Sequence, residues 1–169
     1  MSRVVAIEEE ERCAGFFSEL HSDHALLLQE SAIKDCVAAA RQYETVNTKA
    51  RLKALGFAPS QQQCVALGAP ALLIPVWGID GQIKNYELRP NKPRIRDGKP
   101  IRYERPKGSS VCLDIPNLEA VRQSLRCGDS PLFITEGSRK VDSGISQELP
   151  ASASAVLMRG AALKRLSRA

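Results

Sequence analysis

The first third of the chain carries apolar residues at helical spacing. Between residues 24 and 42 they recur every three or four positions, which predicts an amphipathic helix preceded by Ser22, a favoured N-cap residue. A second, shorter helix is predicted for residues 48–55, because Gly56 follows it and glycine commonly ends a helix. This part of the chain therefore predicts a helical segment.

The pattern changes at residue 71, where apolar residues become contiguous. Residues 71–77 predict a strand, in which Pro75 indicates an edge position or a bulge because proline cannot donate a ladder hydrogen bond. Asp80 and Gly81 form the dipeptide typical of a tight hairpin turn, and residues 82–89 predict the returning strand. The pattern thus predicts an antiparallel hairpin.

Pro, Gly and basic residues dominate the stretch from 90 to 108. It predicts a long loop around a short strand at residues 101–104, and long ordered loops are often functional. Residues 111–115 predict another strand. A helix is then expected to run through Leu118 and Leu125 and to end near Gly128.

The most informative apolar run is residues 132–136, which stops abruptly at Glu136 and Gly137. It predicts a buried strand whose last residue presents a carboxylate at the carboxyl edge of a sheet, with a helix beginning near Ser138. In open α/β sheets, ligands and metal ions bind at this edge. Glu136 is therefore the first candidate site residue.

Composition and charge place the chain in a broad class. Of 169 residues, 43% are hydrophobic and 25% charged, as in ordinary soluble domains. The N-terminus lacks the features of a signal peptide, and the most apolar run is too short to span a bilayer. We therefore expect a cytoplasmic protein with no membrane partner.

The cysteines and histidines argue against a metal or disulfide framework. The five cysteines are scattered without a C-x-x-C pair, which favours reduced thiols. His21 and His24 form H-x-x-H, but no cysteine or acidic cluster lies nearby to complete a zinc site. A histidine near a helix start is the simpler interpretation.

The net charge of +5 is concentrated in one segment. Residues 84–107 hold nine basic and three acidic residues, so they carry +6 and the rest of the chain carries −1. Such a patch is typical of contacts with a phosphate backbone. The alternative is a solvated loop that charge keeps soluble. The candidate phosphate-binding residues of this segment are Arg89, Arg94, Arg96, Lys99, Arg102 and Lys107.

The ordered set of motifs resembles the core of bacterial-type DNA primases. It resembles more closely a primase-like domain of unknown function that occurs in plasmid and phage replication proteins. The matching letters run in order through "IP", "DG", "LRP", "GKP", "Y" and "PKG", and then "ITEG" followed by a lysine. Each motif is weak alone, but together they cover roughly residues 20–145.

The resemblance implies a TOPRIM module, in which a glutamate at a strand end and an Asp-x-Asp pair on a later strand hold magnesium for nucleotidyl transfer. Glu136 would be the catalytic and metal-associated glutamate, and Gly137 would allow the tight turn beside it. Lys140 matches a lysine typical of the replication-protein variant and would be a further phosphate-binding residue. Arg89, Arg102 and Lys107 would contact nucleotide or template phosphates.

The chain departs from that pattern after Glu136. No Asp-x-Asp pair follows, Asp142 is the last aspartate, and residues 151–169 contain no acid. This tail does not resemble the next strand of a TOPRIM module; it could instead form a basic amphipathic helix, and it suggests a truncated or frame-shifted sequence. We therefore expect Mg-dependent transfer only if a downstream polypeptide supplies further carboxylates.

The expected fold class is α+β or α/β. The expected segments are a loosely ordered lead-in (1–21), a helical segment (22–68), a primase-like subdomain with the basic loop (69–128), the first strand and helix of a TOPRIM-like module (129–150), and a divergent basic tail (151–169). Single-stranded DNA or nucleotides are the expected partners, with a helicase as a further candidate. Two alternatives remain: an inactive remnant, or a non-enzymatic module that binds single strands and stacks bases on Trp77, Tyr86 or Tyr103.

Overall fold

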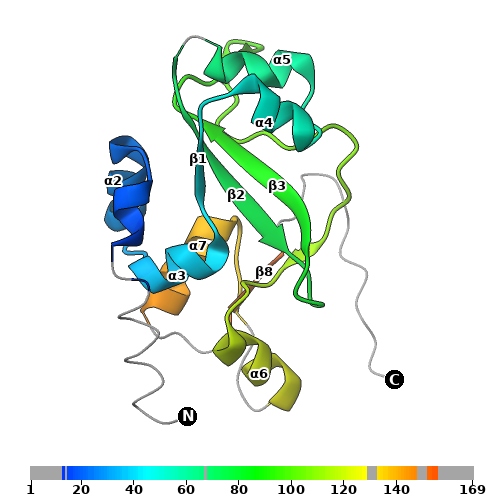
Figure 1. The fold of residues 1–169 in the computed structure, drawn as a ribbon. Coiled ribbons are helices and arrows are strands. Elements are labelled where there is room, and N and C mark those ends of the chain that lie inside the picture. Colours follow the sequence, from blue (N-terminus) through cyan, green and yellow to red (C-terminus); the bar gives the residue numbers. More distant parts are fainter. Residues whose placement is uncertain (1–12, 14, 67, 129–132, 148–151, 156–169) are drawn as a thin grey trace.

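A computed structural model describes residues 13, 15–66, 68–128, 133–147 and 152–155. Its centre is a three-stranded antiparallel sheet in the order β1-β2-β3 (Figure 1). Strand β2 (Ala71–Trp77) is buried along its whole length. It pairs with β3 (Ile83–Pro90) from Ala71 to Trp77 and with β1 (Glu44–Val46) from Ala71 to Leu73. The predicted hairpin is confirmed: the Gly78 N–H donates to the Gln82 carbonyl at 2.8 Å across the turn.

Pro75 lies in β2, the central strand of the sheet, so the prediction that this strand is an edge strand is wrong. The pairing with β1 stops at Leu73, however, so Pro75 has a strand neighbour on one side only, where it pairs with Tyr86. The predicted bulge is present one residue later, where the register shifts between Val76 and Trp77. Proline is tolerated there because the adjoining stretch of β1 is missing.

Alternation along β2 divides the core into two layers. Ala71 and Leu73 belong to a buried cluster with residues of α4 (Lys49–Ala54) and of the 3-10 turn η2 (Gln63–Val65), which follows α5 (Pro59–Gln62). Leu72 and Ile74 point to the opposite face, where α2 (Ser22–Glu30) and α3 (Asp35–Arg41) cover the sheet. The sheet is therefore sandwiched between two sets of helices (Figure 1).

The prediction of one continuous helix over residues 24–42 is wrong. Residues 31–34 are not helical and separate α2 from α3. The Ser31 hydroxyl donates back to the Leu27 carbonyl at 2.7 Å, and Ala32 has a positive φ of 56°. This kink brings Ile33 and Val37 into the core at 3% and 4% exposure. Burial of these side chains outweighs the uninterrupted helical periodicity.

The part of the lead-in described by the structure is packed. The 3-10 turn η1 (Phe16–Glu19) places Phe16, Phe17 and Leu20, all half-buried, against the α2–α3 layer. The Gly15 N–H donates to the Asp35 carboxylate at 2.9 Å. The expectation of loose order therefore fails for residues 15–20, while residues 1–12 lie outside the described part.

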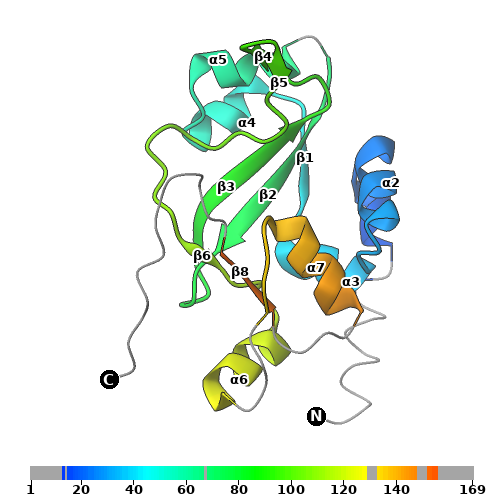
Figure 2. The same cartoon turned by 180° about the vertical axis from the view of Figure 1, so that it is seen from behind.

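The long basic loop contains a small ribbon that the sequence prediction missed. Strands β4 (Ile95–Arg96) and β5 (Lys99–Pro100) pair across Asp97 and Gly98, with φ of 51° and 74° (Figure 2). This is a second Asp-Gly turn, so its signal was present in the sequence. The strand predicted at residues 101–104 is wrong, since only Glu104 makes a bridge, with Leu88.

A second small sheet has the order β6-β8-β7 and holds β6 (Leu113–Asp114), β8 (Ser152–Ala155) and β7 (Phe133–Ile134). Strand β7 is parallel to β8, and α7 (Ser138–Ser146) connects them. The tail prediction is thus wrong for residues 152–155, which form the next strand. The remaining tail residues lie outside the described part.

Two further predictions concern the same region. Helix α6 (Glu119–Cys127) ends at Gly128 in a left-handed conformation, as expected. Strand β7 is not buried: Phe133 and Ile134 are 47% and 58% exposed, because β7 is an end strand of this sheet. Among the described residues, no helix has both the length and the apolar character needed to cross a membrane.

Candidate nucleic-acid interface

Strand β3 presents two charged side chains to one face of the central sheet. Tyr86 and Leu88 pack toward α4 and α5, so the alternating residues Glu87 and Arg89 face the opposite side. That side carries α2 and α7 (Figure 1). Two cavities lie there, one beside each of these charged residues.

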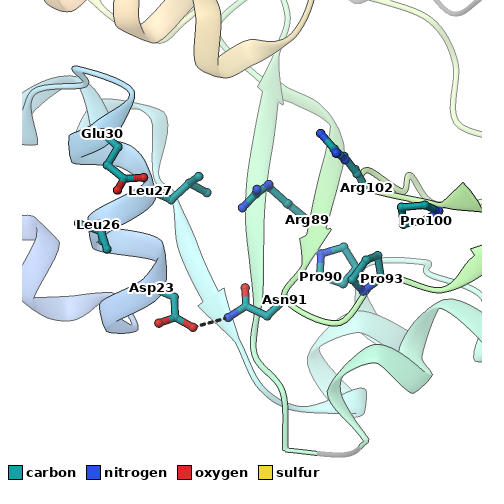
Figure 3. A pocket seen from close by; sticks show the side chains of 10 residues that line it. All are labelled: Asp23, Leu26, Leu27, Glu30, Arg89, Pro90, Asn91, Pro93, Pro100 and Arg102. Atoms are coloured by element: carbon teal, nitrogen blue, oxygen red, sulfur yellow. Dashed lines mark hydrogen bonds between the residues drawn. The ribbon is translucent and has the colours of Figure 1, made fainter.

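The first cavity, called here the α2–β3 cavity, has a volume of about 630 Å³. Figure 3 shows Arg89 and Arg102 on its β3 side and Asp23 and Glu30 on α2 opposite. The remaining lining residues are Leu26, Leu27, Pro90, Asn91, Pro93 and Pro100. The arginines give this open groove two cations, while the α2 carboxylates limit its positive charge.

A hydrogen-bonded chain attaches α2 to the sheet beside this cavity. The Asn91 amide donates to Asp23 at 3.0 Å, so its carbonyl oxygen is free to accept from His24 Nε2 at 2.9 Å. His24 Nδ1 then accepts from the Thr45 hydroxyl at 2.9 Å, which itself accepts from the His21 N–H. Burial lowers the pKa of His24, although the bond to Asn91 opposes this shift. His24 is therefore a structural histidine near the start of α2.

The second cavity, called here the Glu136 cavity, has a volume of about 310 Å³. It is formed where the β7–α7 turn meets β3 and the basic loop. Its lining residues are Ile74, Glu87, Tyr103, Glu136, Gly137, Ser138, Arg139 and Lys140. The structure thus brings the predicted residues Glu136 and Lys140 together.

Arg139 joins the two cavities. Its Nε donates to the Tyr103 hydroxyl at 3.0 Å, and its Nη1 donates to the Ser31 hydroxyl at 2.9 Å. Tyr103 follows Arg102 of the first cavity, and Ser31 follows Glu30 of the first cavity. The two hollows therefore lie next to each other, separated by this bridge.

The Glu136 cavity contains two carboxylates. Glu136 is exposed and makes no ion pair or hydrogen bond within the described part of the chain, whereas Glu87 is buried and accepts from Arg105 Nε at 3.1 Å. The described ranges contain no cluster of three potential metal ligands. Mg²⁺ is commonly held by one or two carboxylates together with phosphates and water, so this donor set fits an ion shared with a phosphate ligand, not a closed protein site.

The basic segment separates into neutralised and available cations. Arg94 pairs with Glu104, which raises the pKa of Arg94; Arg105 pairs with Glu87 and Lys84 with Asp80. Of the predicted phosphate-binding residues, Arg89 and Arg102 line the α2–β3 cavity. Arg96 and Lys99 are exposed on the β4–β5 ribbon, and Lys107 is exposed on the following loop.

A buried charged cluster, which sequence reasoning missed, holds α7 in place. Arg41 is fully buried and donates to Asp142 through Nη2 at 2.6 Å and to Asp114 through Nη1 at 2.6 Å. Tyr43 donates to Asp142 at 2.7 Å. Burial opposes the charge of Arg41, but Asp142 and Asp114 raise its pKa above the ordinary value. Partners 73 and 101 residues away leave no local signal in the sequence.

The three aromatic residues proposed for stacking differ in position. Trp77 is 5% exposed and donates its indole N–H to the Arg41 carbonyl, so it is a core residue. Tyr86 packs half-buried against the α4–α5 layer. Tyr103 is 39% exposed and lines the Glu136 cavity. Among these three, only Tyr103 is placed to contact a ligand there.

Solved structures of DNA primase cores share this fold. The zinc-binding and RNA polymerase domains of Aquifex aeolicus primase match 92% of this chain with a TM-score of 0.56 and 15% identity, over 42% of their own length. The RNA polymerase domain of Mycobacterium tuberculosis primase DnaG, solved with double-stranded DNA, matches 97% of this chain with a TM-score of 0.53 and 17% identity, over 57% of its length. A DnaG primase catalytic domain bound to ssDNA matches 91% with a TM-score of 0.50 and 11% identity, over 55% of its length.

The mixed helix–sheet fold is therefore that of a DNA primase core, and the expected fold class is confirmed. The chain spans about half the length of the primase structures it matches. No protein-family model matches the sequence, and no curated protein matches it.

Proposed function

We propose that this chain is a replication primase-like domain that binds single-stranded DNA or nucleotides across the α2–β3 and Glu136 cavities. The observation that carries the proposal is the distribution of charge. Within the described residues, Arg89, Arg102 and Lys99 form no ion pair with a carboxylate, and Arg96 lies 3.7 Å from the exposed Asp97. Arg89 and Arg102 line the first cavity, and Arg96 and Lys99 lie on the neighbouring ribbon. Phosphate backbones are bound by cations of this kind.

The primase fold supports the same assignment. The structural neighbours include one primase domain bound to ssDNA and one in complex with double-stranded DNA. The ion pairs also decide which cations can bind phosphate, because Arg94 pairs with Glu104 and Arg105 pairs with Glu87. We therefore assign phosphate contacts to Arg89, Arg96, Lys99 and Arg102, with Lys107 and Lys140 as outlying contacts, and not to Arg94.

Catalysis would depend on magnesium. In this proposal Glu136 would hold Mg²⁺ only together with ligand phosphates and with carboxylates from a further polypeptide segment. When bound, the metal would neutralise charge on the transferred phosphoryl group. We expect no primer synthesis by these 169 residues with Mg²⁺ and nucleotides. A Mg²⁺-dependent product that disappears in Glu136→Ala would show that no additional acids are needed.

A non-enzymatic single-strand-binding module is the second candidate. The exposure of Tyr103 favours it, since base stacking on an aromatic ring needs no metal. A Tyr103→Leu variant would lose affinity for oligonucleotides in this case. Tyr103→Phe would retain it, because phenylalanine keeps the ring and loses only the bond from Arg139.

The test of the interface uses fluorescence anisotropy with a labelled single strand of about 20 nucleotides, between about 50 and 200 mM salt. Arg96→Glu/Lys99→Glu is expected to weaken binding at least tenfold and to reduce the slope of log affinity against log salt by about 1.4, for two lost phosphate contacts. Lys49→Glu/Lys53→Glu is the matched control, because it makes the same charge change on exposed residues of α4. An equal loss of affinity in both variants would show that only the net charge of the protein matters, and it would overturn the assignment of these phosphate contacts.

A further inference from the structure

Ser138 has a buried hydroxyl without a partner at the start of α7. The residue is 1% exposed, it lines the Glu136 cavity, and its Oγ makes no hydrogen bond within the described structure. Buried polar groups are nearly always paired, so each exception requires an explanation. One explanation is that its partner belongs to a ligand.

The backbone around Ser138 points to the same chemistry. Helix α7 has nine residues, and its N-cap is Gly137, which offers no side chain to satisfy the first N–H groups. Unsatisfied N–H groups and the helix dipole favour an anion at such an end. The helix N-terminus and the unpaired hydroxyl of Ser138 thus lie at the lining of one cavity.

The charges in the cavity are compatible with an anion. Arg139 is held only by the neutral hydroxyls of Tyr103 and Ser31, and Lys140 is exposed without a carboxylate partner in the described part. Against these two cations stands Glu136, since Arg105 already neutralises Glu87. When Arg105, which pairs with Glu87 from outside the lining, is included, these side chains leave one positive charge in excess.

We infer that the N-terminus of α7, with Ser138 Oγ, Arg139 and Lys140, is a phosphate-binding subsite beside Glu136. Arg139 exchanges its two neutral partners for the phosphate, which opens the bridge between the two cavities. The phosphate belongs either to the polyphosphate of a mononucleotide or to the backbone of a nucleic acid strand. The inference rests on the proposed function in placing phosphate ligands on this face.

The test measures binding of inorganic pyrophosphate by calorimetry, with EDTA present so that no metal takes part. Ser138→Ala is expected to weaken binding about tenfold, the loss of one hydrogen bond to a charged group. Ser143→Ala, the same substitution on the same helix outside the cavity, should leave it unchanged. Ser138→Ala should also melt no lower than the parent, because it removes a buried hydroxyl that makes no hydrogen bond within the described structure.

Three results would overturn the inference. They are no binding of pyrophosphate by the parent, binding of pyrophosphate by Ser138→Ala with the affinity of the parent, or a melting temperature that falls in Ser138→Ala but not in Ser143→Ala. Competition then identifies the source of the phosphate. Displacement of pyrophosphate by a nucleoside triphosphate assigns a mononucleotide, and displacement by an oligonucleotide assigns the backbone. If the parent binds pyrophosphate but Arg96→Glu/Lys99→Glu leaves oligonucleotide affinity intact, the proposed interface fails and the subsite stands.

Discussion

Replacing Arg41 by methionine should strongly destabilise the protein. Methionine keeps much of the arginine volume but removes the charge and every hydrogen bond that the guanidinium makes to Asp142, Asp114 and the Pro75 carbonyl. The ion-paired side chains of Arg41, Asp114 and Asp142 are all 0% exposed. The variant therefore leaves two carboxylates without a counter-charge in a water-free environment.

The expected cost is about 3–5 kcal/mol in the free energy of unfolding, the range for breaking a buried pair by removing one partner. An exposed pair of similar geometry provides the control. Arg51 Nη2 lies 2.7 Å from Glu44, but the two side chains are 45% and 38% exposed. Arg51→Met should therefore cost no more than about 1 kcal/mol.

The assay is urea unfolding followed by circular dichroism, repeated across pH. Burial raises the pKa of Asp142, and Arg41 opposes this shift, so removing Arg41 raises the pKa further. When the pKa of a carboxyl is higher in the folded state than in the unfolded state, the group contributes to stability at pH values below its unfolded pKa. This contribution is lost as the pH rises through the folded pKa. The gap between parent and Arg41→Met should therefore widen from acidic to neutral pH.

A gap that stays constant over this pH range would refute the argument, because a packing defect alone does not titrate. A cost below about 1 kcal/mol, equal to that of Arg51→Met, would refute it as well. Should Arg41→Met fail to fold, Arg41→Lys keeps the charge without the forked donors. The free energy of unfolding of Arg41→Lys should lie below that of the parent and above that of Arg41→Met.

Three further outcomes follow from local geometry. Burial of the neutral ring lowers the pKa of His24, so the stability that His24 contributes is present above its unfolded pKa and is lost as the pH falls through its folded pKa. Urea unfolding of the parent should therefore show a lower free energy of unfolding at acidic pH, and His24→Gln should show a smaller decrease. Leu72→Ala, at a fully buried position in the central strand, should cost about 2–5 kcal/mol by the same assay, whereas a cost below 1 kcal/mol would contradict the sandwiched sheet. Gly137→Ala should cost about 1–3 kcal/mol from its φ of 80° and ψ of 136° alone, since among the described residues no atom beyond its chain neighbours lies within 4 Å of the added carbon; an unchanged melting curve would show that this backbone conformation is not required.

Short-range signals predicted most of the elements. Helix α4 is followed by Gly56 with φ of 81°, as the sequence predicted, and at its start Thr48 accepts from the Arg51 N–H. The Asp80-Gly81 turn and the start of α7 at Ser138 are also where they were predicted. Caps and tight turns depend on the conformation of a few neighbouring residues, so their signals are local.

The candidate site was predicted in part. Glu136 and Lys140 share one cavity, and Arg89 and Arg102 share the adjacent one, but the sequence predicted neither Ser138 nor Arg139 as a ligand-binding residue. Their importance depends on a missing partner and on a bridge to Tyr103, 36 residues away along the chain. Neither property is visible before the chain is folded.

The amino-acid sequence by itself determined the local elements, the excess of positive charge in residues 84–107 and the acid at the end of β7. Only the tertiary structure decided which charges remain available for a ligand. Glu104 and Glu87 neutralise Arg94 and Arg105, while Arg89 and Arg102 stay open to the cavity. The physical reason is that an ion pair depends on distance in space, and folding sets that distance between residues that sequence order leaves apart.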